Sequence, residues 1–161
     1  MGNELVKYDQ QNAIAIITIN RSDAMNSFNT ELRSELYAAI KRAASDQSIK
    51  VVVLTGEGRS FSAGADLKTI EASDDVGEVL QNEYRPIFEI ITSMRQPIIA
   101  AVGGSAAGIG MSCALACDLL IMADDAFLLS PFTTISLVPD GGLNWLLVNQ
   151  LGYRLCHTNI H

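Results

Sequence analysis

The sequence has 161 residues, of which 48% are hydrophobic and 18% are charged, and its formal net charge is −7. This composition predicts one globular domain with a sizeable core and excludes a disordered chain. The sequence contains no basic cluster, so a nucleic-acid partner is not expected.

Cysteine and histidine positions exclude several kinds of site. Cys113 and Cys117 lie one helical turn apart in an apolar stretch and Cys156 stands alone, which favours core thiols in a reducing compartment over a disulfide framework. Both histidines, His157 and His161, come at the end of the sequence, which argues against a metal cluster or a Ser–His pair before them. The sequence has no signal segment and no apolar run long enough to span a bilayer, so we expect a cytoplasmic protein without a membrane partner.

Hydrophobic periodicity predicts an α/β fold with parallel or mixed sheets. In chain order we expect strands at 4–10 and 13–20, a helix at 30–45, a strand at 50–55, a helix at 76–94, a strand at 98–102, a helix at 109–117, strands at 119–122 and 126–129, and a helix at 143–151.

Some of these elements carry more detailed expectations. The strand at 13–20 is apolar enough to be covered on both faces, and the strand at 119–122 is also expected to be buried. Thr30 is the expected N-cap of the first helix, and Gly152 is the expected C-cap of the last one. Pro86 is expected to kink the long helix.

Two turns rich in glycine and alanine, 62–66 and 103–110, each follow a predicted buried strand. A backbone with few side chains allows a ligand to lie directly on it, and the helix predicted at Ile109 points free N–H groups into the second turn. One N–H donor from each turn at a single point would form an oxyanion hole. The alternative is tight packing of helix against strand without a ligand.

A reaction also needs an acid or a base, and Asp140 is the best candidate. It follows an apolar stretch, and a carboxylate against apolar walls has a raised pKa that suits a base near neutral pH. The alternative is that Asp140 caps the helix at 143–151. Structural roles are favoured for Asp66 and Asp118, and Ser112 lacks a histidine partner in the core.

Four motifs in this order resemble the enoyl-CoA hydratase/isomerase (crotonase) family. They are NRSDAMN at 20–26, VVVLTGEGRSFSAGADLK at 51–68, AVGGSAAGIG at 101–110 and ACD at 116–118. The resemblance extends over about residues 5–152 and implies a spiral of ββα units that binds an acyl-coenzyme A thioester and stabilises its enolate. It implies no metal or redox cofactor.

The resemblance also implies roles for individual residues. The backbone N–H groups of Ala65 and Ile109 would form the oxyanion hole, and Asp140 would carry the chemistry, as in ring-modifying isomerases of phenylacetate breakdown and related dehalogenases. The two glutamates of hydratases fall at Ser112 and Phe132, neither of which is a general base, so an isomerase is favoured. The expected substrate-binding residues are Arg21, Ala24, Ala63, Asp66, Leu67, Gly108, Ser112, Phe132 and Pro139.

Members of this family continue into a C-terminal helical region that covers the acyl pocket and forms much of the trimer contact. We therefore expect an acyl-CoA-binding core at 1–152 that lacks this region, with an irregular tail at 153–161 caused by truncation or a frameshift. A trimer or hexamer of identical chains is expected if the truncation permits it. Two alternatives to the isomerase remain: a hydratase or hydrolase on the same fold, and an inactive acyl-CoA-binding chain.

Overall fold

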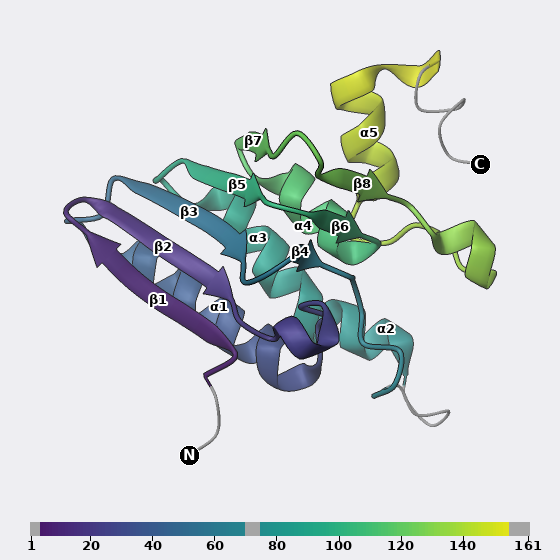
Figure 1. The fold of residues 1–161 in the computed structure, drawn as a ribbon, viewed down its shortest axis with the longest axis horizontal. Coiled ribbons are helices and arrows are strands. Elements are labelled where there is room, and N and C mark those ends of the chain that lie inside the picture. The colour runs from purple at the N-terminus through teal and green to yellow at the C-terminus, as the bar shows by residue number, and fades with distance from the viewer. Residues whose placement is uncertain (1–3, 70–74, 155–161) are drawn as a thin grey trace.

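The computed structural model describes residues 4–69 and 75–154, and its strands form two sheets (Figure 1). The larger sheet has the order β1-β2-β3-β5-β7, with β1 antiparallel to β2 and the other neighbours parallel. The smaller sheet has the order β4-β6-β8 and is parallel. The strands are β1 (Val6–Gln11), β2 (Ile14–Ile19), β3 (Val51–Gly56), β4 (Ser60–Ser62), β5 (Ile98–Val102), β6 (Ser105–Ala107), β7 (Leu119–Met122) and β8 (Phe127–Leu129).

A ββα pattern recurs along the chain. After β1, β2 and the first helix, each long strand of the larger sheet is followed by a short strand of the smaller sheet and then by helix. The helices are α1 (Thr30–Ser45), α2 (Val76–Val79), a π-helical turn (Leu80–Tyr84), α3 (Arg85–Ser93), α4 (Ile109–Ala116) and α5 (Leu143–Leu151). This order confirms the predicted α/β spiral of ββα units. The expected loops around 60–62 and 105–107 contain the short strands β4 and β6.

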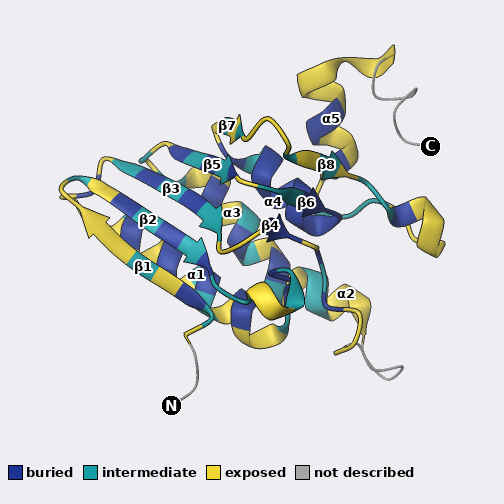
Figure 2. Ribbon diagram, viewed as in Figure 1, coloured by how far each residue is buried: buried dark blue, intermediate teal, exposed yellow. Residues whose placement is uncertain are grey.

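The main core lies between the larger sheet and the helices behind it in Figure 1. Ala15, Ile17 and Ile19 of β2 point into this core and are fully buried (Figure 2). On the opposite face of β2, Ile16 is only half-buried and Ile14 is 41% exposed. The prediction that β2 is covered on both faces is therefore wrong, because α1 packs on one face only.

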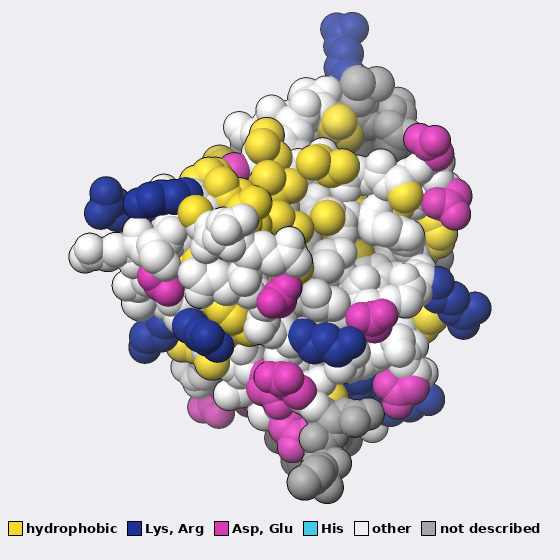
Figure 3. All heavy atoms as spheres, turned by 60° about the vertical axis from the view of Figure 1, so that its left-hand side comes forward, with side chains coloured by type: hydrophobic (Ala, Val, Ile, Leu, Met, Phe, Trp, Pro, Cys, Tyr) yellow, Lys and Arg dark blue, Asp and Glu magenta, His cyan; other side chains and the backbone are white. Residues whose placement is uncertain are grey.

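The strand β7 differs from its prediction in the same way. It lies at the edge of the larger sheet, where Leu119 is 57% exposed and Ile121 is 59% exposed, so the expected burial of this strand is wrong. Leu119 pairs with Ile99 of β5, whose side chain on the same face is half-buried. Hydrophobic side chains also gather in a surface patch in Figure 3.

Helix ends follow local chemistry that the sequence predicted in part. Asn29, not Thr30, caps α1, because its side-chain oxygen accepts a hydrogen bond of 2.9 Å from the N–H of Leu32. The expected single helix at 76–94 is instead α2, the π-helical turn and α3. The π-helical turn ends two residues before Pro86, which has no N–H. Gly152 is the C-cap of α5, as predicted.

The tail predicted at 153–161 lies largely outside the described residues. Within it the structure describes Tyr153 and Arg154, whose backbone is helical, and the irregular tail stays a prediction. No helix in the described ranges has the length and apolar character required to span a membrane.

Two glycines allow the chain to pass closely from one sheet to the other. A Cβ on Gly56 would lie 2.3 Å from the carbonyl oxygen of Ser60, and a Cβ on Gly104 would lie 2.1 Å from that of Arg59. Both distances are far below van der Waals contact. At Gly56 and Gly104, where the chain passes between the two sheets, there is therefore room for a hydrogen atom but not for a side chain.

We predict that Gly104→Ala destabilises the chain by about 1–3 kcal/mol, because the added methyl group overlaps a backbone oxygen that packing holds in place. Gly103→Ala is the matched control, since nothing lies within 4 Å of its added Cβ, and we expect a change of less than about 0.5 kcal/mol. Urea unfolding of both variants measures the difference. Equal changes in the free energy of unfolding for the two variants would show that the backbone around Gly104 is not tightly packed.

Candidate functional site

The first glycine-rich turn forms an isolated strand-like contact with Phe28. The N–H of Phe28 donates to the carbonyl of Gly64 at 2.7 Å, and the N–H of Asp66 donates to the carbonyl of Phe28 at 3.1 Å. In a parallel bridge of this kind the residue between the two bonds directs its own N–H to the opposite side. That residue is Ala65, and its N–H finds no acceptor among the described residues.

The second turn ends at Gly108, which has φ 53° and ψ −130°, a conformation that favours glycine. Its N–H donates to the carbonyl of Leu129 at 3.0 Å, which ties the turn to β8. The next residue, Ile109, is the first of α4, so its N–H lies at the helix end where no intrahelical acceptor exists. Within the described part of the chain this N–H has no hydrogen-bond partner.

The structure brings the two turns together. A Cβ on Gly64 would lie 3.5 Å from the nitrogen of Ile109 and 2.9 Å from the carbonyl oxygen of Ala107. The tight packing considered as an alternative is therefore present, and it places the segment that carries Ala65 against the start of α4. Two unpartnered N–H groups on adjoining rigid segments form an arrangement that can receive negative charge on a carbonyl oxygen.

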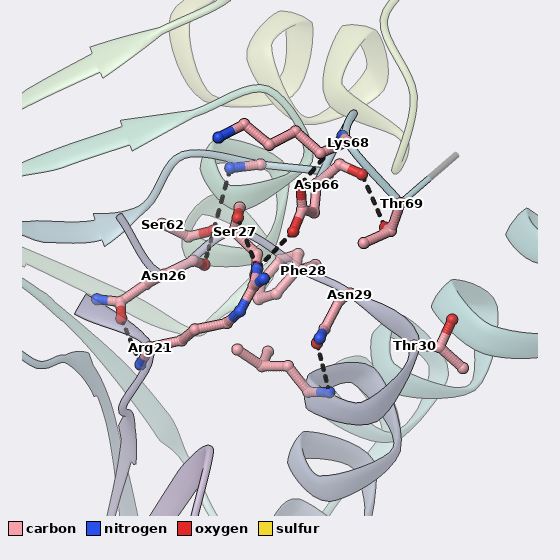
Figure 4. A network of polar contacts seen from close by, with 12 residues as sticks. Arg21, Asn26, Ser27, Phe28, Asn29, Thr30, Ser62, Asp66, Lys68 and Thr69 are labelled. Carbon is pink, nitrogen blue, oxygen red and sulfur yellow. Dashed lines mark hydrogen bonds and ion pairs between the residues drawn. The ribbon is translucent and has the colours of Figure 1, made fainter. Parts of the chain in front are cut away.

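Arg21 and Asp66 hold the polar side of the first turn (Figure 4). Arg21 Nη1 donates to Asp66 Oδ2 at 2.6 Å and also to the carbonyl and hydroxyl oxygens of Ser27. Burial alone would raise the pKa of Asp66, but hydrogen bonds from Arg21 and from the N–H of Lys68, with their positive charges, lower it below its ordinary value. These groups shape the loop, and direct contact of Arg21 or Asp66 with a ligand stays a prediction.

Asp140 lies in the turn before α5 and does not use its side chain as a cap. The N-cap of α5 is Gly142, and no side chain caps the helix. The Oδ1 atom of Asp140 is buried and has no hydrogen-bond partner in the described structure. Burial raises the pKa of this carboxyl group to about 6, against a smaller opposing effect of its own backbone N–H. The group can therefore be ionised, and act as a base, near neutral pH.

Ser112 fixes the turn that carries Asp140. Its hydroxyl group donates to the carbonyl oxygen of Asp140 at 3.1 Å, and the residue is fully buried. A Cβ on Gly141, which has φ 58°, would lie 2.8 Å from Ser112 Cβ and 3.0 Å from Phe88 Cζ. Ser112 therefore has no exposed side-chain surface in the described structure, and its observed contact is with the turn that carries Asp140. Its expected role in substrate binding stays a prediction. The small residue at 112 opposite the glycine at 141 is the sequence signal that was missed.

The other expected substrate-binding residues occupy varied positions. Ala63 is exposed and Leu67 is 56% exposed, so both are open to a ligand beside the first turn. Ala24 ends a short 3-10 turn, and Pro139 is half-buried next to Asp140. Phe132 is buried in the apolar cluster beneath α5 and leaves little side-chain surface for a ligand.

Sequence reasoning also missed a partly buried ion pair beside the Phe28 contact. Arg33 of α1 is buried, and its Nη2 atom lies 2.6 Å from Glu83 Oε2 in the π-helical turn. Fifty positions separate the two residues in the chain, so neither helical periodicity nor a local motif could indicate the pairing.

The remaining reactive side chains have structural places. Cys113 and Cys117 are free and buried, which confirms the prediction of core thiols, and burial raises the pKa of Cys113 to about 12. Asp118 accepts a hydrogen bond of 2.8 Å from the N–H of Ile98, as expected for a residue that binds backbone. The described ranges contain no group of three or more His, Cys, Asp or Glu residues that could hold a metal ion.

Known proteins resemble the chain in sequence and in fold. Residues 9–160 match the family model described as Enoyl-CoA hydratase/isomerase. A Rhodobacter capsulatus protein named "Probable enoyl-CoA hydratase" is 40% identical over 153 residues, which cover 94% of this chain and 59% of the relative. The "1,2-epoxyphenylacetyl-CoA isomerase" of Escherichia coli is 33% identical over 154 residues, which cover 92% of this chain and 59% of that relative.

A solved structure agrees with these sequence relatives. The crystal structure of an enoyl-CoA hydratase from Bacillus anthracis superposes with a TM-score of 0.90 at 31% identity, covering 98% of this chain and 62% of that chain. The chain spans about 59% of the length of the two curated relatives.

We predict that Asp140→Asn stabilises the chain near neutral pH and that this gain shrinks in acid. The pKa of Asp140 is 3.8 in an unfolded chain and about 6 in the folded chain. At pH values between these two, the folded chain therefore binds the proton of Asp140 more tightly than the unfolded chain does. Stability therefore falls as pH rises through this window, and asparagine removes the loss. Thermal unfolding of both proteins from about pH 7.5 down to about pH 4 measures it. A gain that stays constant with pH would contradict the raised pKa.

Proposed function

The chain belongs to the enoyl-CoA hydratase/isomerase family, and we propose that it is an acyl-CoA isomerase in which Asp140 moves a proton along the acyl chain. The observation that carries the proposal is the buried, unpartnered carboxylate oxygen of Asp140, whose pKa is about 6. The unpartnered N–H groups of Ala65 and Ile109 supply the second requirement of the reaction, because they can donate hydrogen bonds to the thioester oxygen.

The reaction that we propose needs only protein groups and substrate. For a 3-enoyl-CoA, the ionised Asp140 takes a proton from C2, and the electron pair of the broken C–H bond spreads onto the thioester oxygen. The N–H groups of Ala65 and Ile109 stabilise that charge, an effect worth about 100- to 1,000-fold in rate for one donor. Asp140 then returns the proton to C4, and the double bond has moved from C3 to C2 without oxidation or added water.

Two features favour an isomerase over a hydratase. By family resemblance the hydratase glutamates fall at Ser112 and Phe132, and neither side chain can act as a base in this role; both are buried. The one base that we propose, Asp140, suffices for taking and returning one proton. The Escherichia coli relative that carries an isomerase name supports the same choice.

Hydration of a 2-enoyl-CoA is the second candidate, favoured by the name of the Rhodobacter capsulatus relative. In that case Asp140 would activate water instead of taking a substrate proton. The product distinguishes these reactions, because hydration adds one water to the thioester whereas isomerisation leaves its mass unchanged. Release of free coenzyme A would identify a hydrolase, and binding without any change would identify an inactive acyl-CoA-binding chain.

We also propose that identical chains associate. The support is the apolar surface at the edge of the larger sheet, where the side chains of Leu119 and Ile121 are exposed. Contiguous apolar surface on a folded chain is commonly covered by a partner. The number of chains in such an assembly is open to measurement by light scattering.

The test of the proposed function follows proton exchange. The chain is incubated in deuterated water with a 3-enoyl-CoA or with a saturated acyl-CoA, and mass spectrometry follows the thioester. We expect deuterium uptake and a 2-enoyl product, a rate that rises with pH through about 6 and then levels, and a loss of at least about 100-fold in Asp140→Asn.

Asp125→Asn serves as the control, because it removes an exposed carboxylate from the loop between β7 and β8. Its rate should equal that of the unsubstituted chain. Undiminished exchange in Asp140→Asn would refute the role of Asp140, and added water in the product would favour the hydratase.

A further inference from the structure

Arg33 has an unusual environment for a positive charge near the start of a helix. It lies in the first turn of α1, where the helix dipole disfavours a cation, and it is only 8% exposed. All five of its N–H bonds are used. Nε and Nη2 donate to Glu83 Oε2 at 2.8 and 2.6 Å, Nη2 also donates to Thr30, and Nη1 donates to the carbonyl of Phe28 at 3.0 Å and to the hydroxyl of Tyr84 at 3.2 Å.

The bond to Phe28 connects this cluster to the candidate oxyanion hole. The carbonyl oxygen that accepts from Arg33 also accepts the N–H of Asp66, and the N–H of Phe28 holds Gly64. These backbone bonds set the direction of the N–H of Ala65. The guanidinium group is therefore two hydrogen bonds away from a group that we assign to the thioester oxygen.

The π-helical turn completes the cluster from the other side. It brings Glu83 and Tyr84, which are adjacent in sequence, to the same guanidinium group, whose carbon lies 4.7 Å from the centre of the Tyr84 ring. The Tyr84 ring in turn meets the Phe28 ring edge to face, with centroids 6.2 Å apart. Phe28 is thus fixed both at its carbonyl oxygen and at its ring by groups that depend on Arg33.

We propose that Arg33 is a positioning residue for the oxyanion hole, and that with Glu83 it holds the Phe28 carbonyl and hence the N–H of Ala65 in place. The inference rests on the proposed function for its catalytic consequence, but the positioning is a property of the chain alone. A planar guanidinium group can bind Phe28, Tyr84 and Glu83 together, whereas an ammonium group cannot reproduce this fork.

The first measurement needs no substrate. Hydrogen exchange of the backbone amides is compared in the unsubstituted chain, Arg33→Met and Arg33→Lys. We expect the Asp66 amide to exchange about tenfold faster in both variants, because its acceptor is no longer held, while the amide of Val52 in β3 serves as an internal reference and is unchanged. Arg33→Lys keeps the positive charge opposite Glu83 but loses the planar guanidinium group. It therefore tests the loss of the forked hydrogen bonds without the loss of the charge, and it serves as the test variant if Arg33→Met does not fold.

The second measurement is the proton-exchange reaction with acyl-CoA. We expect kcat to fall by about 10- to 100-fold in Arg33→Lys with KM changed by less than about threefold, since a displaced N–H weakens the transition state more than substrate binding. Arg85→Met is the matched control, because Arg85 forms an equally short 2.6 Å pair with Glu89 on the exposed surface of α3. It should change neither measurement.

The outcomes separate the two claims. If the Asp66 amide keeps its protection in Arg33→Lys, the positioning role is refuted even when the chain is an active isomerase. If protection is lost but the unsubstituted chain exchanges no proton with acyl-CoA, the positioning stands and the proposed function fails. If protection and kcat fall together while KM holds, both are supported.

Discussion

The candidate site depends on one short contact, the parallel bridge between Phe28 and the segment 64–66. Two backbone hydrogen bonds in this bridge decide which way the N–H of Ala65 points. The bridge joins a loop before α1 to a turn after β4, and the close approach of Gly64 to the start of α4 then adds the N–H of Ile109. Arg33 donates a hydrogen bond to the carbonyl of Phe28, and Arg21 donates one to the carboxylate of Asp66.

The pKa values of the two carboxyl groups at the candidate site, Asp66 and Asp140, are shifted in opposite directions. Asp66 lies against Arg21 and the N–H of Lys68, which keep it ionised and fix its position. Asp140 is also largely shielded from water, but its buried Oδ1 has no hydrogen-bond partner in the described chain and its pKa is raised. A carboxylate held by partners is a structural element, whereas one deprived of them is available to take a proton.

Local patterns in the sequence predicted the order of the longer strands and helices, the span of α5 and the pair of bare turns, because periodicity and glycine content express backbone preferences directly. They did not predict the short strands β4 and β6 or the π-helical turn. They did not predict which sheet faces stay uncovered, since β2 and β7 are apolar whether or not a helix packs on them. The Arg33–Glu83 pair and the support of Asp140 by Ser112 arise from contacts between distant segments. Such contacts become visible only when the fold is known.

The ordering of strands in the larger sheet also has a consequence for how the chain is made. Every pairing from β2 to β7 is parallel, so each strand must wait for an intervening helix or loop before it can find its neighbour. Sheets of this kind form slowly, because the chain loses the entropy of loop closure before the paired strands contribute favourable free energy. During synthesis the edge of β2 that pairs with β3 stays unpaired until β3 has emerged, and an unpaired apolar edge is prone to aggregation.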